Sequence, residues 1–279
     1  MGFKFLGYLL IAFSINATAQ DDIIGRIIIY KTEYEDNFYD IARKFDLGID
    51  ELIYANPGID PWIPGDGAEL IIPSMHILPS KPHQGIVINK AELRLYFFPK
   101  NSDAVITFPV SIGILGHETP EGITSITAKQ LDPYWISPPS MRLENPDIPE
   151  FIPPGANNPL GKYALYLGWQ SIIIHSTNKP WSIGAYGSHG CIRMYPEDAK
   201  ILFHKVKVGT PVRIVNEPIK LGFIKGDLYI EVSPSSKQSV NLQAIKANIL
   251  NKYKKDAINE ELLDKILVES SVIPIRINK

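Results

Sequence analysis

The chain has a single cysteine, Cys191, among its 279 residues. One thiol cannot form an intramolecular disulfide, and it also excludes a zinc site built from paired cysteines. The fold must therefore be held together by buried apolar surface, which a hydrophobic content of 45% can supply. Cys191 follows the polar and flexible segment 187–190, Gly-Ser-His-Gly, which is unlike the sequence of a core strand. This setting favours a reactive thiol over the alternative of a buried structural cysteine.

Two histidines lie upstream of Cys191 in the same part of the chain. His175 ends the apolar run 171–175, and His189 stands two residues before the cysteine. A cysteine nucleophile needs a neighbouring base or cation that favours its thiolate form. We favour His175 as this base and expect His189, together with Ser188, to support the loop. The residues alone leave His189 open as the alternative base.

The first 19 residues have the pattern of a secretory signal peptide. Lys4 precedes an apolar run over 5–13, and the small residues Ala17 and Ala19 form a cleavage site. The apolar run is shorter than the roughly 20 residues that span a bilayer. We therefore predict an exported chain with no membrane span after cleavage. The alternative is an uncleaved N-terminal anchor.

The formal net charge of the chain is −2. A protein that binds nucleic acid or an anionic membrane surface usually carries a strongly basic balance or a basic patch. Neither nucleic acid nor a membrane surface is therefore an expected partner.

Residues 26–73 have the pattern of a small β-α-α-β unit. A β-branched run at 27–30 comes first, apolar residues at helical spacing follow between Phe38 and Phe45, and 68–73 form a closing strand. This unit resembles the LysM module. The resemblance rests on Ile41-Ala42-Arg43-Lys44-Phe45, Asp50-Glu51-Leu52, Ala55-Asn56-Pro57-Gly58 and Leu70-Ile71-Ile72-Pro73.

LysM modules bind the N-acetylglucosamine backbone of peptidoglycan or chitin in a shallow groove between their two connecting loops. The resemblance implies that Asp36, Asn37, Asn56 and Pro57 lie near the sugar. The family usually has Gly-Asp-Thr at the first turn, where this chain has Glu-Asp-Asn at 35–37. The alternative is a LysM-shaped spacer that binds no glycan.

Residues 74–84 are expected to form a linker, and residues 85–216 a mainly β domain. The prolines between 133 and 159 predict a long ordered loop without helix or regular sheet, of a kind that often shapes a site. After Cys191, Pro196 and the two acidic residues that follow it begin a helix.

The last part of the chain, residues 217–279, is predicted to hold a hairpin at 221–232 and a helical extension. Apolar residues at helical spacing over 240–267 indicate an amphipathic helix that is broken near Asp256. We expect this helix to pack on the domain before it. A partner-binding role is the alternative.

The segment that contains Cys191 resembles the active-site signature of the L,D-transpeptidases, the YkuD family. His175 is followed, after a spacer of twelve residues, by Ser-His-Gly-Cys-Ile-Arg at 188–193. The likeness extends over about residues 85–216. It includes Pro109-Val110-Ser111-Ile112-Gly113, Glu118-Thr119-Pro120, Pro153-Pro154-Gly155, Asn158-Pro159-Leu160-Gly161 and Gly209-Thr210-Pro211-Val212. One departure is Ser176, where many members have glycine and others have serine.

This resemblance implies a fold and a set of roles. The fold would be a mainly β, YkuD-like sandwich with a helix after the cysteine. Cys191 would be the nucleophile, His175 the base, and the backbone carbonyl of Ser176 the group that orients the imidazole. The N–H groups of Gly190 and Cys191 would hold the oxyanion, and Arg193 would bind a substrate carboxylate. The alternative for Arg193 is a surface salt bridge.

The resemblance also implies a function. The enzyme would act on a peptidoglycan stem tetrapeptide and attack the peptide carbonyl that follows an L-centre. This attack would release D-alanine. The acyl group would then pass to an amine. The products would be 3→3 cross-links, or a protein or amino acid attached to the stem. The order of the parts, with a LysM module first and an additional C-terminal region last, is similar to that of the periplasmic branch of the family. This branch includes the lipoprotein-attaching enzymes. A wall-attached lipoprotein is then a possible partner, and the expected compartment is the periplasm.

Two other functions compete with this one. Water as the acceptor would make an L,D-carboxypeptidase or another hydrolase of the same substrate, and an inert domain would leave a wall-binding protein. No cofactor is expected. The remaining histidines are isolated in the sequence, so no metal site is predicted either. They are His76, His83, His117 and His204.

Overall fold

The computed structural model describes residues 22–234 and 241–279. The predicted signal peptide at 1–19 lies outside these residues. Within the described part of the chain, every helix is too short or too polar to cross a lipid bilayer.

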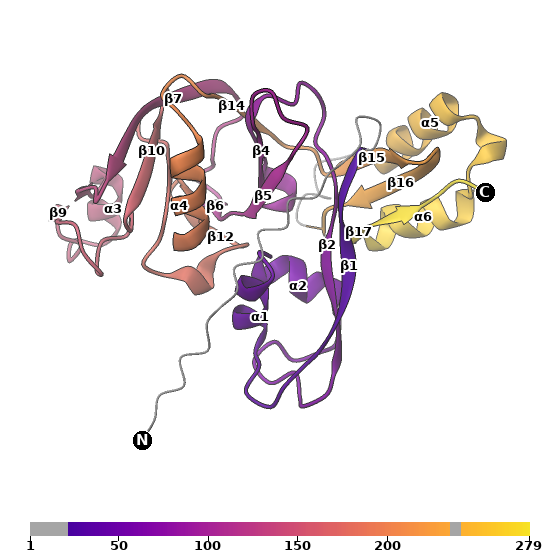
Figure 1. Cartoon of the computed structure of the whole chain (residues 1–279), viewed down its shortest axis with the longest axis horizontal. Helices are drawn as coiled ribbons and strands as arrows, with labels where there is room; N and C mark the ends of the chain where they lie inside the picture. The colour runs from indigo at the N-terminus through magenta and orange to yellow at the C-terminus, as the bar shows by residue number, and fades with distance from the viewer. Residues whose placement is uncertain (1–21, 235–240) are drawn as a thin grey trace.

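The N-terminal module consists of two strands and two helices in the order β-α-α-β (Figure 1). Strands β1 and β2 pair antiparallel along their whole length. Asn37 begins the first helix, where its side chain accepts a hydrogen bond from the Asp40 backbone N–H. Apolar side chains of both helices pack on one face of the β1–β2 ribbon. The elements are β1 (Ile23–Lys31), α1 (Phe38–Lys44), α2 (Ile49–Ala55) and β2 (Glu69–Ile77).

Strand β2 continues beyond the predicted end of the module. Ser74 to Ile77 pair with residues 23–26 of β1, so the first part of the expected linker is strand. Pairing with β1 satisfies the backbone N–H and C=O groups of this segment. The proline-rich sequence, which is typical of a linker, does not reveal that pairing. Only 78–84 connect the module to the next domain.

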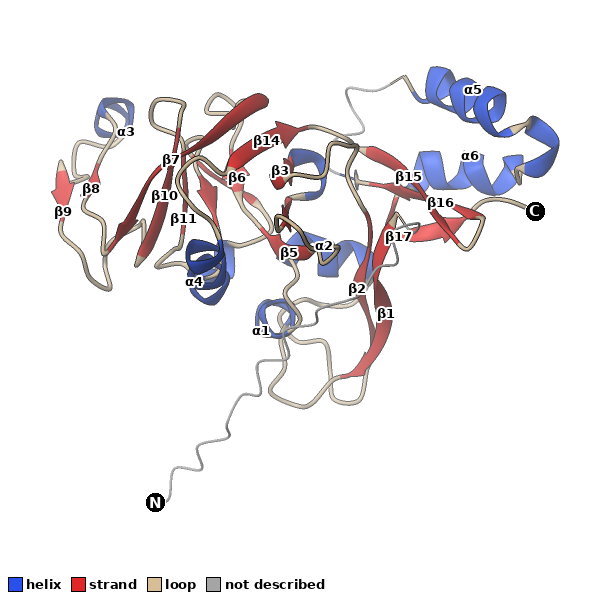
Figure 2. Ribbon diagram, turned by 45° about the horizontal axis from the view of Figure 1, so that its top comes forward, coloured by secondary structure: helices blue, strands red, loops and turns tan. Residues whose placement is uncertain are grey.

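The central domain is mainly β, as predicted, but its strands form one continuous eight-stranded sheet in place of the expected sandwich. The physical reason is the long strand β7 (Gly122–Leu131). Its first part pairs with β14 and its second part with β10, so it joins the two halves of a sheet that curls around its core (Figure 2). The strand order is β13-β11-β10-β7-β14-β3-β4-β5.

The pairs β14–β3 and β11–β13 are parallel, and the other pairs of this sheet are antiparallel. Helix α4 (Pro196–Lys205) follows the cysteine as predicted, with Pro196 in its first turn. The remaining strands of the sheet are β3 (Gly85–Asn89), β4 (Arg94–Phe98), β5 (Ile106–Pro109), β10 (Tyr163–Leu167), β11 (Ile173–His175), β13 (Ile192–Arg193) and β14 (Pro211–Val215).

The proline-rich segment 133–159 contains regular structure, contrary to the prediction. Strands β8 (Trp135–Ile136) and β9 (Phe151–Ile152) pair with each other, and helix α3 (Pro139–Glu144) lies between them. Proline fits the first turn of a helix, where its missing N–H has no partner to lose. The segment projects from the end of the sheet farthest from the C-terminal part (Figure 1).

The C-terminal part has its own apolar core, in which the two described helices pack on a sheet of the same part and not on the central domain, contrary to the prediction. The predicted hairpin is β15 (Ile219–Ile224) with β16 (Asp227–Val232), and the helical pattern is interrupted near Asp256 as expected. Strand β17 (Ser271–Arg276), which the sequence analysis missed, pairs with β16. The helices are α5 (Leu242–Tyr253) and α6 (Glu260–Glu269).

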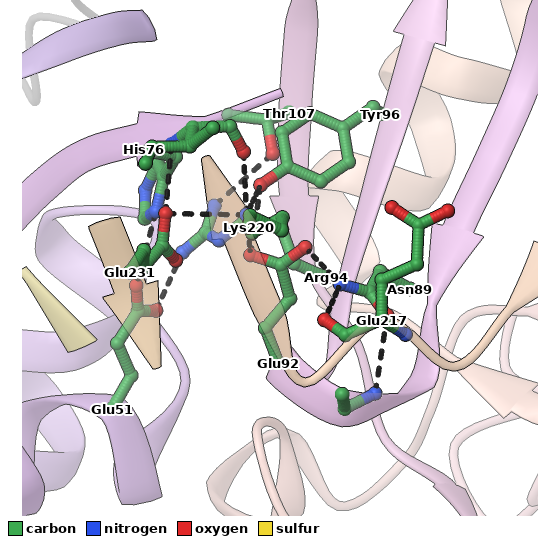
Figure 3. A network of polar contacts seen from close by, with 12 residues as sticks. Glu51, His76, Asn89, Glu92, Arg94, Tyr96, Thr107, Glu217, Lys220 and Glu231 are labelled. Carbon is green, nitrogen blue, oxygen red and sulfur yellow. Dashed lines mark hydrogen bonds and ion pairs between the residues drawn. The ribbon is translucent and has the colours of Figure 1, made fainter. Parts of the chain in front are cut away.

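A buried network of charged side chains joins the three parts of the molecule (Figure 3). Arg94 of the central sheet contacts Glu51 of α2 at 2.6 Å. Lys220 of β15 contacts Glu92 at 2.6 Å and Glu231 of β16 at 3.2 Å. The Glu231 carboxylate also accepts a hydrogen bond from the Ile77 backbone N–H at the end of β2.

These charges are almost fully removed from water, so each depends on its partner. Burial raises the pKa of Glu231 to about 8, and the Lys220 ammonium opposes this shift. A buried ion loses several kcal/mol of hydration, which only close pairing with an opposite charge offsets. The network therefore holds the N-terminal module, the central domain and the C-terminal part in one arrangement.

We expect Arg94→Met to lower the free energy of unfolding by about 3–5 kcal/mol, because it leaves the buried Glu51 carboxylate without its arginine counter-ion. Urea unfolding measures this loss. The double variant Arg94→Met/Glu51→Gln should recover part of it. The matched control is Lys265→Ala, which removes an exposed 4.0 Å pair with Glu269 and should cost less than about 1 kcal/mol. Equal effects of Arg94→Met and Lys265→Ala would contradict the structural role of the network.

Candidate active site

The parallel pairing of β11 with β13 brings together residues that are far apart in the sequence. Ile174 lies opposite Ile192, and both side chains are buried in the core. Because side chains alternate along extended chains, the neighbours His175, Cys191 and Arg193 face the other side. Consistent with this placement, the Arg193 charge acts on the pKa of both groups: it adds to the lowering of the His175 pKa by burial, and it partly opposes the raising of the Cys191 pKa by burial.

His175 is held in one orientation by the residue that follows it. Its Nδ1 hydrogen-bonds the backbone carbonyl of Ser176, and only 4% of the residue is exposed. A carbonyl oxygen can only accept, so Nδ1 carries the proton and Nε2 keeps its lone pair. Burial, reinforced by the positive charge of Arg193, lowers the pKa of His175 to about 4. The ring is therefore neutral at neutral pH, with Nε2 able to accept a proton.

The side chain of Ser176 fixes this backbone in place. Its hydroxyl donates to the carbonyl of Leu160 at 3.1 Å and accepts the N–H of Lys162 at 2.8 Å. Gly161 comes so close that a Cβ there would lie 2.1 Å from the Ser176 Oγ. The serine thus ties the end of β11 to the turn before β10, which a glycine at this position cannot do.

The Cys191 thiol lies half-buried at the start of β13. Its Sγ is 3.4 Å from the backbone carbonyl of Ser171. Among the described residues, no hydrogen bond joins Sγ to the ring of His175 or His189. Burial raises the pKa of the Cys191 thiol, while the Ile173 backbone and the Arg193 charge lower it to a smaller extent. In this arrangement the thiol and the imidazole are both neutral at neutral pH.

Hydrogen bonds hold the backbone on both sides of the Cys191 thiol. Gly190 has a φ of +93°, a conformation that glycine adopts without strain. The Thr119 hydroxyl donates to the Gly190 carbonyl at 2.9 Å, and the Ser188 hydroxyl donates to the Cys191 carbonyl at 2.5 Å. The first bond orients the peptide group that carries the Cys191 N–H, and the second holds the peptide group that follows the cysteine. Thr119 was visible only as part of the Glu118-Thr119-Pro120 motif, which did not suggest this contact.

Arg193 is partly buried, and its guanidinium has no acidic partner within 4.0 Å among the residues that the structure describes. The backbone of Arg193 pairs with Ser111, which fixes the start of the side chain. Burial lowers the pKa of Arg193. The surface salt bridge that was the alternative for Arg193 is therefore not formed within the described chain. A partly buried cation near the thiol remains able to bind an anionic group.

His189 does not contact Cys191 but lies in a separate cluster. Its Nε2 is 3.3 Å from one oxygen of Glu144, and the Nε2 of His117 is 3.0 Å from the other. The two imidazole rings have centroids 4.4 Å apart. Neither Glu144 nor His117 was singled out from the sequence, because the three residues come from separate segments that only the fold brings together.

Most of the residues predicted to lie near a sugar form hydrogen bonds within the N-terminal module itself. The Asn56 amide is buried and bonded to Leu52 and Ile71, so this residue cannot bind a sugar directly, which corrects the expectation. Asn37 caps α1 and Asp36 accepts the Tyr30 hydroxyl. Pro57 is exposed.

Comparisons with known proteins show which family this chain resembles. The family described as the L,D-transpeptidase catalytic domain (YkuD) matches residues 83–214. A probable L,D-transpeptidase of Escherichia coli K12, YbiS, is 37% identical over 251 residues, which cover 85% of this chain and 82% of YbiS. A second from the same organism, ErfK/SrfK, is 42% identical over 184 residues, 64% of this chain and 59% of the relative.

Among solved structures, the catalytic domain of an Enterococcus faecium L,D-transpeptidase is 22% identical, covers 49% of this chain and 99% of that domain, and has a TM-score of 0.38. The chain belongs to the L,D-transpeptidase family.

A pH profile of thiol alkylation tests the charge state of the site. If Cys191 is a neutral thiol with a raised pKa, its rate of alkylation by iodoacetamide should keep rising up to and beyond pH 9, because only the thiolate reacts. Mass spectrometry follows the single cysteine without interference. A plateau between pH 6 and 8 would instead show a preformed thiolate–imidazolium pair and contradict this assignment.

Proposed function

We propose that this chain is an exported, periplasmic L,D-transpeptidase that acts on peptidoglycan stem peptides through a Cys191 acyl-enzyme. The observation that carries the proposal is the placement of His175, Cys191 and Arg193 on one face of the β11–β13 pair, with the imidazole orientated by the Ser176 carbonyl. A nucleophile, a base with a free nitrogen lone pair and a cation are the groups that acyl transfer from an anionic peptide requires.

In the first half of the reaction, rotation of the Cys191 side chain turns Sγ from the Ser171 carbonyl towards Nε2 of His175. Catalytic hydrogen bonds are often long in the free enzyme and shorten when substrate binds. His175 then takes the thiol proton as Sγ attacks the stem carbonyl. The oxyanion is held by the N–H groups of Gly190 and Cys191, where one such donor is typically worth about 10²–10³ in rate. When the C–N bond breaks, His175 returns the proton to the departing D-alanine, and a thioester remains.

In the second half, an amine replaces D-alanine. His175 takes a proton from the incoming amine, the nitrogen attacks the thioester carbonyl, and the C–S bond breaks. The thiol is regenerated when the proton passes back to sulfur. A stem peptide as acceptor makes a 3→3 cross-link, a protein makes a wall-attached lipoprotein, and water makes an L,D-carboxypeptidase or other hydrolase, since one acyl-enzyme serves all of these.

The N-terminal module supports a role in binding the glycan strand. Its β-α-α-β order is that of the LysM pattern, and it is fixed to the central domain by the Arg94–Glu51 contact. Exposed aromatic side chains at Tyr34 and Trp62 offer the kind of flat apolar surface on which sugar rings pack. Through this module the enzyme would stay near the stem peptides that it acts on.

Three variants test the assignment of the nucleophile and the base. Purified protein is incubated with disaccharide-tetrapeptides, and the products are identified by mass spectrometry. Cys191→Ala should form no thioester and no product. His175→Gln should reduce the rate by at least about 100-fold, since it removes the base. His189→Gln should retain activity within about tenfold of the unchanged protein.

The same spectra identify the acceptor, because cross-linked dimers, trimmed tripeptides and peptides bearing an amino acid differ in mass. Activity that survives His175→Gln but is lost in His189→Gln would make His189 the base. A chain that binds sacculi but forms no thioester and none of these products would be the inert wall-binding protein instead.

Arg193→Gln tests recognition of the substrate carboxylate. A buried charge-assisted hydrogen bond contributes about 1.5–3 kcal/mol, so KM for a diaminopimelate stem should rise about 10- to 100-fold. The matched substrate is a stem whose diaminopimelate carboxylate is amidated, for which the variant and the unchanged protein should have similar KM values. An equal loss with both substrates would show that Arg193 supports the loop and does not bind the carboxylate.

A further inference from the structure

Two histidines and a glutamate meet beside the loop that carries Cys191. His117 lies in the turn after β6 (Ile112–Gly113), Glu144 is the last residue of α3, and His189 lies between β12 (Tyr186–Ser188) and the cysteine. One nitrogen of each ring and an oxygen of the carboxylate lie within 4.8 Å of one another. The proposed reaction uses neither His117 nor Glu144.

The spacing of these atoms suits a small metal ion. The Glu144 oxygens are 3.0 Å from the Nε2 of His117 and 3.3 Å from the Nε2 of His189. Ligand atoms that bind zinc tetrahedrally at its usual bond lengths lie roughly 3.3 Å apart. The two separations between glutamate and histidine are therefore near the value that an ion requires.

The donor set also indicates which ion would bind. Imidazole nitrogens with one carboxylate are ligands of zinc and of neighbouring divalent transition metals, whereas magnesium and calcium prefer oxygen alone. All three side chains are partly exposed, with side-chain exposures of 30%, 53% and 23% for His117, Glu144 and His189. Water can therefore occupy a fourth position, as it does in open zinc sites.

We propose that His117, Glu144 and His189 form a binding site for a divalent transition-metal ion of the zinc class. The ion joins three segments that are distant in the sequence and ties α3 of the proline-rich segment to the loop of Cys191. The connection is close, because Gly190, the residue after His189, is itself held by the Thr119 hydroxyl.

Zinc titration of untagged protein that carries Cys191→Ser tests the site, since this background removes the thiol as a competing ligand. Calorimetry should show one zinc ion per chain. His117→Gln and Glu144→Gln should each weaken binding at least tenfold, because each removes one of three protein ligands. The matched control is His204→Gln, an exposed histidine on α4 outside the cluster, which should leave the affinity unchanged.

Trypsin cleavage after Arg142 in α3 provides a second readout that depends on the position of the ion. Zinc should slow this cut at least severalfold in the Cys191→Ser background and have no effect when His117→Gln is added. The proposal is overturned if no binding is measured up to millimolar zinc, if zinc binds only when Cys191 is present, or if both cluster variants bind as tightly as the control.

Discussion

The parallel contact between β11 and β13 is the interaction on which the active site depends. It is short, with only Ile174 opposite Ile192 and His175 opposite Arg193. It nevertheless sets which side chains share a face, because side chains alternate along an extended backbone. The buried isoleucines anchor this register in the core. A shift of β13 by one residue would turn Ile192 out of the core and place the thiol and the imidazole on opposite sides.

Around the β11–β13 contact, several polar side chains form hydrogen bonds with backbone groups and not with other side chains. Ser176, Thr119 and Ser188 use their hydroxyls on carbonyl or N–H groups next to His175 and Cys191. Such contacts lock the positions from which the imidazole and the oxyanion donors work, so little rearrangement is needed when charge develops. Farther away, the ion pairs of Arg94 and Lys220 hold the three parts of the molecule together in the same way.

The local elements were largely predictable, and the exceptions have a common cause. The β-α-α-β order, the helix after Cys191 and the break near Asp256 all follow from spacing and capping within a few residues. The end of β2, the strand β17 and the continuity of the sheet through β7 were missed or wrong. Each depends on a partner strand that is distant in the sequence, and pairing supplies hydrogen bonds that local patterns do not encode.

The sequence by itself determined that one thiol stands in a polar loop with His175 and His189 upstream, and its motif indicated the family. The tertiary structure alone decided which groups share a site. It set His175 beside the Ser176 carbonyl, left the Arg193 guanidinium without an acidic partner in the described chain, and gathered His117 and Glu144 around His189. The physical reason is that charge, burial and hydrogen bonding act across a few ångströms of space, and a linear order of residues does not specify those distances.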